Sequence, residues 1–211
     1  MDNQVSHDAG IISLLSDFAD ILIINFLWLV TSIPIITLGA STAAVYSVMR
    51  SPGDKRYTSS ILVLYFTAFA RNFKKATAIF LLLLIPGALV IVNAFLLLFG
   101  LLETSVVGYA LCGLSLILFV SLWVYVFPLV ATFENGVFKT IANALVLSVA
   151  HFPTTLAVIV LSAIPLLVLL FWTNLFYRTV FVWVFVVVAL VSKVDALLVE
   201  RVLKRYIPQE S

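Results

Sequence analysis

The sequence predicts an all-α integral membrane protein, a polytopic bundle of about five transmembrane helices with further helices at the cytoplasmic surface. First, 64% of its 211 residues are apolar and 10% are charged, whereas soluble domains average about 45–50% apolar and about 25% charged residues. Second, five apolar stretches reach the length of about 20 residues that a membrane-spanning helix needs. Third, the alternating pattern of a β-barrel is absent, and an open sheet leaves unpaired backbone groups in lipid.

The five predicted spans follow one another without a linker or an internal repeat, so we expect residues 1–211 to form a single domain. They cover residues 21–48, 76–102, 106–130, 156–176 and 180–198. The first apolar segment lacks preceding basic residues and a clear cleavage site, so we expect it to be retained and not removed as a signal peptide.

A group of small and polar residues interrupts the first predicted span. Pro34 removes a backbone donor, and Gly39 provides a flexible joint, so we expect a helix break here, with Thr37 inside it. Gly39 and Ala43 lie four residues apart and form a face of small residues on which another helix can pack. This segment is therefore either a kink with a tight helix contact or a broken-helix substrate or ion site, as in some transporters.

Two amphipathic segments are predicted on the cytoplasmic side. Residues 58–75 combine aromatic residues at helical spacing with a basic end, which is typical of an interfacial helix. This helix could anchor the protein to lipid or bind a cytoplasmic partner through Phe69, Arg71, Asn72, Phe73, Lys74 and Lys75. Residues 137–151 form the second segment, with an expected common face of Phe138, Ile141, Ala142, Leu145 and Ser148.

Lysine and arginine are distributed unevenly among the connections between the predicted spans. With five crossings, one side receives 11 of the 12 basic residues and the other receives only Arg178, because no basic residue precedes Arg50. Since basic residues concentrate in cytoplasmic connections, we expect the N-terminus outside and the C-terminus in the cytoplasm. Asp195 and its charged neighbours are expected in a solvated cytoplasmic extension of the last helix.

No catalytic, cofactor or metal site is predicted. His7 and His151 are expected on opposite sides of the membrane, and Cys112 has no nearby basic partner. No buried charge is available to couple ions to transport, and Asn25, Asn93 and Asn174 are expected to bond between helices. The scarcity of basic stripes argues against nucleic-acid binding.

Two stretches resemble one family. Residues 25–46, which include the run from Ser32 to Tyr46, and residues 65–77, which include Arg71, Asn72, Phe73 and Lys74, are similar to motifs of the YesL-like bacterial integral membrane proteins. That family has no established biochemical activity or catalytic residues. Its members are commonly encoded beside carbohydrate-uptake ABC transporters, so the resemblance implies a role in sugar import at the bacterial cytoplasmic membrane.

Two functions are therefore expected as alternatives. The leading one is a non-enzymatic accessory or regulatory component of an ABC-type carbohydrate uptake system, bound to the sugar permease subunits. The alternative is a small-solute transporter that acts alone as a homodimer, with the segment from Pro34 to Gly39 along its path. A permease subunit itself is disfavoured because the chain lacks the Glu-Ala-Ala loop of importer permeases.

Overall fold

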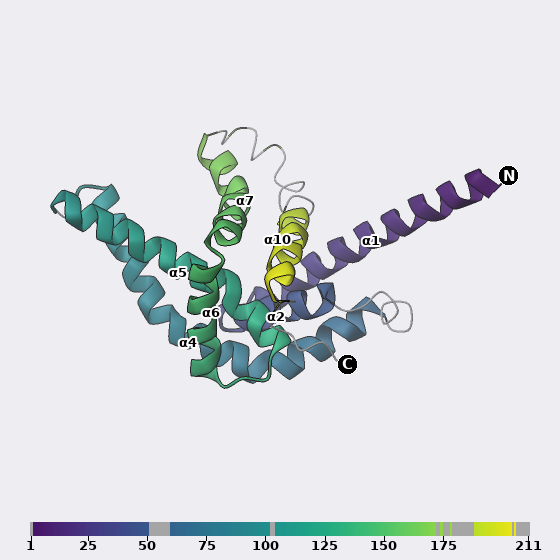
Figure 1. The fold of residues 1–211 in the computed structure, drawn as a ribbon, viewed down its shortest axis with the longest axis horizontal. Helices are drawn as coiled ribbons and strands as arrows, with labels where there is room; N and C mark the ends of the chain where they lie inside the picture. Colours follow the sequence, from purple (N-terminus) through teal and green to yellow (C-terminus); the bar gives the residue numbers. More distant parts are fainter. Residues whose placement is uncertain are drawn as a thin grey trace.

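The computed structural model describes residues 2–50, 60–101, 104–171, 174, 178, 188–203 and 205, and their regular elements are all helices (Figure 1). The all-α prediction is confirmed for these residues. The elements are α1 (Asp2–Ser32), the short 3-10 helix η1 (Ile35–Thr37), α2 (Leu38–Met49), α4 (Ile61–Leu98), α5 (Val106–Thr132), α6 (Val137–Ala150), α7 (Phe152–Phe171) and α10 (Val188–Leu203).

The first predicted span, 21–48, corresponds to two helices that lie side by side. Trp28 of α1 donates a hydrogen bond from Nε1 to Oγ1 of Thr42 in α2, at 3.2 Å. Ile24, which precedes Trp28 in α1, packs in the same cluster as Val48, which follows Thr42 in α2. Because the contacts run in opposite directions along the two helices, α1 and α2 are antiparallel, and Pro34 lies at their turn.

Helix α4 is continuous through the predicted junction between a surface helix and a span. It contains 38 residues, which at about 1.5 Å per residue gives a length of about 57 Å. The sequence suggested a separate interfacial helix that ends at Lys75, but no break occurs there. The prediction is corrected because Lys75 and Ala76 both favour helix, and nothing in the sequence ends it.

Helices α4 and α5 form a long antiparallel pair that extends away from the other helices (Figure 1). Phe80 packs edge-on against Trp123, with ring centroids 5.9 Å apart. Further along, a methyl group on Gly87 would lie 2.4 Å from Phe119 Cζ, so Gly87 permits a close contact between the helices. These two helices are long and apolar enough to cross a membrane.

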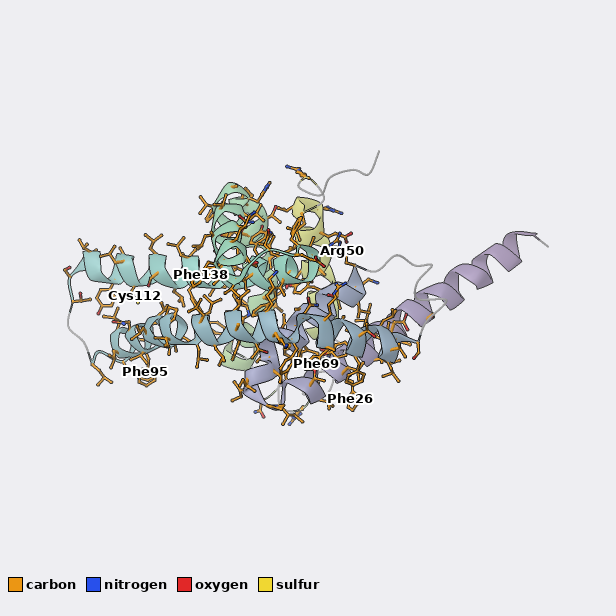
Figure 2. All side chains as sticks on the ribbon, turned by 90° about the horizontal axis from the view of Figure 1, so that it is seen from below. Phe26, Arg50, Phe69, Phe95, Cys112 and Phe138 are labelled. Atoms are coloured by element: carbon orange, nitrogen blue, oxygen red, sulfur yellow. The ribbon has the colours of Figure 1, made fainter. Side chains whose placement is uncertain are left out.

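Much of the apolar surface of this pair points outward. Figure 2 shows side chains projecting from α4 and α5, and Phe95 is 52% exposed. Ile85, Leu89, Leu111 and Leu114 are also exposed. A soluble monomer rarely exposes such a continuous apolar surface, whereas lipid solvates it. This pattern supports embedding of the helices in a membrane.

Helices α6 and α7 follow one another with a bend of 97°. Pro153 lies in the first turn of α7, where it cannot continue the hydrogen bonding of α6. The buried face of α6 consists of Thr140, Ala144, Leu147 and Ser148. The predicted common face is corrected, because Phe138 and Leu145 point outward. Three of the four buried residues are small or polar, and Leu147 is the fourth, whereas several large apolar residues face out, as expected for a helix surrounded by lipid.

The five-span count is not confirmed. Within the described residues, two helices are long and apolar enough to span a membrane, and the bent pair of α6 and α7 adds a third when it is counted as one span. The apolar segments Phe18–Ser32 and Ile35–Met49 are shorter than a normal span. The fourth predicted span begins within α7, and the fifth ends within α10, while its residues 180–187 lie outside the described part of the chain.

Candidate functional site

The predicted helix-break and packing residues hold the α1–α2 hairpin together and against its neighbours. Pro34 is exposed at the turn, and the Thr37 hydroxyl donates to the backbone oxygens of Thr31 and Pro34. Gly39 and Ala43 are buried. A methyl group added at Gly39 would lie 2.7 Å from the backbone oxygen of Ala76, so α2 and α4 touch here through their backbones.

The predicted docking residues divide into internal and external ones. Asn72 is buried and donates from Nδ2 to Ser47 Oγ in α2, at 3.1 Å. Lys75 donates from Nζ to the backbone oxygen of Phe133, at 2.8 Å, and thereby caps the end of α5. Phe69 is half-buried and packs against two hydrophobic clusters, one that includes Phe80 and one that includes Ile24. These three residues join helices and offer little surface to a partner.

Arg71, Phe73 and Lys74 are exposed. Arg71 also borders a groove of about 320 Å³ at the end of the α4–α5 pair, which we call the basic groove. Its lining comprises Arg71, Asn72, Lys75, Val130, Ala131, Thr132, Phe133, Glu134 and Asn135. The docking surface suggested by the sequence is thus reduced to one edge of α4 and the adjoining α5–α6 connection.

A second cavity, of about 340 Å³, lies where α1, α2, α5, α7 and α10 meet, and we call it the Asp195 cavity. Its lining comprises Ile24, Asn25, Trp28, Leu38, Thr42, Val45, Tyr46, Met49, Trp123, Val124, Val158, Ser162 and Asp195. Pockets that bind small molecules have similar volumes, apolar and aromatic walls, and a few polar groups. None of Pro34, Thr37, Gly39 and Ala43 borders it.

Asp195 of α10 is the carboxylate in this lining. Only 6% of its surface is exposed, and its Oδ2 accepts a hydrogen bond of 2.6 Å from Ser162 Oγ in α7. The other oxygen, Oδ1, is buried and has no hydrogen-bond partner among the described residues. The expectation of a solvated Asp195 is therefore wrong, because α7 and the hairpin cover this face of α10. An ionised carboxylate so placed is costly unless a proton or a cation compensates it.

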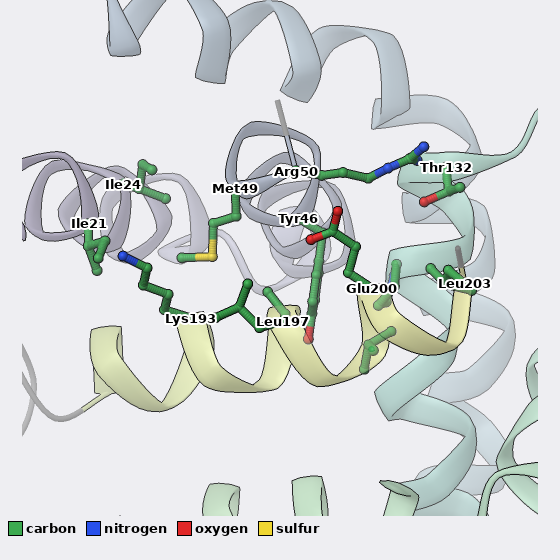
Figure 3. A pocket seen from close by; sticks show the side chains of 13 residues that line it. Ile21, Ile24, Tyr46, Met49, Arg50, Thr132, Lys193, Leu197, Glu200 and Leu203 are labelled. Carbon is green, nitrogen blue, oxygen red and sulfur yellow. The ribbon is translucent and has the colours of Figure 1, made fainter. Parts of the chain in front are cut away.

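Aromatic side chains form part of the cavity wall. Trp28 is oriented by its hydrogen bond to Thr42, and Trp123 is fixed by ring contacts with Phe80, Phe119 and Phe127. Tyr46 extends from α2 toward α10 (Figure 3). Because each ring is held by neighbours, the wall presents aromatic surface and polar groups in a defined arrangement.

Tyr46 also borders a smaller pocket of about 60 Å³, the outer pocket (Figure 3). The two spaces share Ile24, Tyr46 and Met49 as lining residues. Among the described residues, the basic side chains Arg50 and Lys193 and the carboxylate of Glu200 line the outer pocket, whereas Asp195 lines the cavity. Tyr46 and Met49 of α2 are thus part of the wall that the two spaces share.

The groups that line the Asp195 cavity are of the kinds that bind small molecules. Within the described residues, no three His, Cys, Asp or Glu side chains converge as a metal site would require. The Asp195 cavity offers one carboxylate, hydroxyl groups, an amide and aromatic rings. These groups can hold a small polar or charged solute, which they orient through hydrogen bonds and ring contacts.

The sequence pointed to two lining residues, Asn25 and Asp195, but predicted that Asn25 bonds between helices and that Asp195 is solvated. Asn93 is exposed and bonds to its own helix, from Nδ2 to the backbone oxygen of Leu89, and Asn174 is exposed too. One feature of the sequence could have identified Asp195 as a site residue, namely its position inside the predicted span 180–198. An ionisable residue within a span is itself a pointer to function.

Comparison with known proteins gives one match. Residues 21–94 match a family described as protein of unknown function, DUF624. The matched segment covers the apolar part of α1, the whole of α2 and most of α4, and it includes Trp28 and Tyr46 but neither Trp123 nor Asp195. No curated protein and no solved structure matches the chain. The match supports a resemblance to a family without assigned activity.

Proposed function

We propose that the protein is a non-enzymatic membrane protein that binds a small solute in the Asp195 cavity and carries it across the membrane. The observation that carries the proposal is the buried carboxylate with an unpaired oxygen in a cavity of about 340 Å³. The main sequence argument against a transporter was the lack of a buried charge. Asp195 removes that argument.

The proposed binding site lies near broken and bent helices, which is a common arrangement in transporters. The α1–α2 hairpin forms one wall, and α7, which follows the 97° bend, contributes Ser162 to another. Motion of α7 and α10 relative to the hairpin would open or close the cavity. We propose that the protein acts as a homodimer, in which the exposed apolar faces of α4 and α5 are available to a second copy.

Flux into liposomes tests this function. The purified protein alone is expected to transport at least one member of a panel of labelled amines, amino acids and neutral sugars. Thr42→Leu would fill part of the cavity and should reduce flux, whereas Thr67→Leu, on the exposed face of α4, should not. Absence of flux for the whole panel, or equal flux in both variants, would contradict the proposal.

A second candidate function is an accessory or regulatory role in an ABC-type carbohydrate uptake system, with permease subunits as partners. The YesL-like resemblance motivates it, and the basic groove with exposed Arg71 and Lys74 supports it as a surface for protein contact. Affinity purification from native membranes should recover permease subunits, and charge reversal of Arg71 and Lys74 should release them. Lys139→Glu, at an exposed position of α6, is the control. Retention of the subunits by the double variant would contradict this role.

We further propose that the basic end of the molecule faces the cytoplasm of a bacterial cell. The antiparallel hairpin brings the start of its apolar segment and Arg50 to one side, as the contact of Ile21 and Arg50 with the outer pocket indicates. No basic residue precedes Arg50, so the 11-to-1 division of charge is unchanged when the N-terminus is cytoplasmic. We therefore replace the expected external N-terminus by a cytoplasmic one, with the C-terminus also inside.

A further inference from the structure

We infer that the ligand of the Asp195 cavity is a small organic cation, such as a primary or quaternary ammonium compound. This inference rests on the proposed binding function of the cavity but does not require transport. The first observation that supports it is the charge of the cavity lining. Asp195 is the single ionisable carboxylate in the lining, and no lysine or arginine belongs to that lining among the described residues. The ionised cavity therefore carries a net negative charge.

The hydrogen bonding of Asp195 leaves this charge only partly compensated. Ser162 supplies one neutral hydroxyl donor to Oδ2, and no donor to Oδ1 comes from the part of the chain that the structure describes. Arg50 and Lys193 line the outer pocket and not the cavity. A neutral sugar could add a hydroxyl donor, but it would bring no positive charge. A cation compensates the carboxylate directly, so it gains most from the low dielectric constant of the cavity.

The aromatic walls favour an organic cation over a bare metal ion. Trp28 and Trp123 both line the cavity, and Tyr46 adds a third aromatic side chain. The faces of tryptophan and tyrosine attract ammonium groups, and such rings form the sites that bind quaternary ammonium ligands. Metal ions instead require several oxygen ligands around one point, and here a single carboxylate is present. The volume of about 340 Å³ exceeds the needs of a metal ion but suits a small molecule.

Tyr46 lines both the Asp195 cavity and the outer pocket, and the outer pocket also has the charged side chains Arg50, Lys193 and Glu200 in its lining. Arg50 and Lys193 repel every cation, so the preference for a cation comes from the lining of the Asp195 cavity and not from the outer pocket.

The test is a calorimetric titration of the purified full-length protein in lipid nanodiscs. The probes are tetramethylammonium, butylammonium, sodium and glucose, each added separately. We expect saturable binding of the two organic cations, and weaker or undetectable binding of sodium and glucose. Asp195→Asn keeps the shape of the side chain and should weaken cation binding by at least about tenfold. Trp28→Phe, which keeps an aromatic ring with a weaker quadrupole, should weaken it by about threefold.

A matched control removes a carboxylate elsewhere. Asp20→Asn lies on α1 outside both cavity linings and should leave the affinity unchanged. Thermal unfolding of each variant establishes that it is folded. The titrations of the wild-type protein with the four probes test the ligand class even if a variant fails to fold. Failure of both organic cations to bind, tighter binding of glucose, or equal cation affinity in Asp195→Asn would each overturn the inference.

The outcomes separate this inference from the proposed transport. Binding of organic cations without flux in liposomes would support the ligand class and contradict the transporter. Flux of a neutral sugar that is blocked by Thr42→Leu, without cation binding, would support the transporter and contradict the ligand class.

Discussion

At Gly39 the backbone of α2 approaches α4 and α5 more closely than a residue with a side chain permits. An added Cβ would lie 2.7 Å from Ala76 O and 2.9 Å from both Phe80 Cβ and Phe127 Cε1. The first of these atoms belongs to the backbone of a helix, so it cannot move aside as a flexible side chain can. This residue sets the distance between the hairpin and α4, and hence the position of α2, which carries Thr42 and Tyr46.

We predict that Gly39→Ala destabilises the protein relative to Gly113→Ala. Both changes place alanine within a helix, but nothing lies within 4 Å of a Cβ at Gly113. The difference isolates the cost of overpacking, which is about 1–3 kcal/mol. Unfolding by sodium dodecyl sulfate in mixed micelles, followed by tryptophan fluorescence, measures it. Equal unfolding curves for the two variants would show that α2 can shift without cost.

At the scale of elements, Lys75 connects the interior of α4 to the end of α5. Its half-buried ammonium group donates to the carbonyl of Phe133, the residue that follows Thr132 and caps α5. Hydrogen bonds from a charged group to a carbonyl are stronger than neutral ones. Lys74, one residue earlier, is exposed. The two neighbouring lysines therefore have different roles, although they look alike in the sequence.

We predict that Lys75→Met lowers the stability of the protein by about 1–2 kcal/mol, since it leaves the Phe133 carbonyl without its charged donor. Lys74→Met is the control and should change stability by less than about 0.5 kcal/mol. The same unfolding measurement compares them. A loss of stability in Lys74→Met as large as that in Lys75→Met would contradict the assignment of roles.

These elements also show how far the sequence predicts the fold and the site. Apolar composition gave the all-α class and the approximate positions of α4, α5 and α7, because hydropathy depends on local residues. Pro34 gave the break in the first segment, but the reversal of direction there depends on contacts between α1 and α2, such as the bond from Trp28 to Thr42. Hydropathy alone cannot distinguish a kinked span from a hairpin of two shorter helices.

The burial of Asp195 was hidden from the sequence for a similar reason. Its neighbours on α10 include charged residues, and Lys193 and Glu200 are partly accessible, so the segment resembled a solvated helix. Ser162, which bonds to Asp195, is 33 residues earlier in the chain. Only the packing of α7 and the hairpin on one face of α10 separates Asp195 from the accessible residues. The site thus depends on contacts between elements that are distant in the sequence.

At the scale of the whole molecule, the basic residues and the folded hairpin together support the orientation proposed above. Lys75 and Glu134 lie at the end of the α4–α5 pair where α5 ends, and the turn around Gly100 lies at the other end. Arg50 contributes to the outer pocket together with Thr132, the last residue of α5. The described basic residues of the hairpin, α4 and α10 therefore meet at one end, which we assign to the cytoplasm.

We predict that both chain termini are cytoplasmic. In a background with Cys112→Ser, single cysteines at Ser6 and Ser211 should react with a membrane-impermeant maleimide only after the cells are opened. A cysteine at Arg178, the one basic residue assigned to the other side, should react in intact cells and serves as the control. Labelling of Ser6→Cys from outside would mean that the α1–α2 segment crosses the membrane once and does not return as a hairpin. That result would also separate Ile21 from Arg50, dismantle the outer pocket and remove one wall of the Asp195 cavity, so the orientation of the N-terminus bears directly on the proposed site.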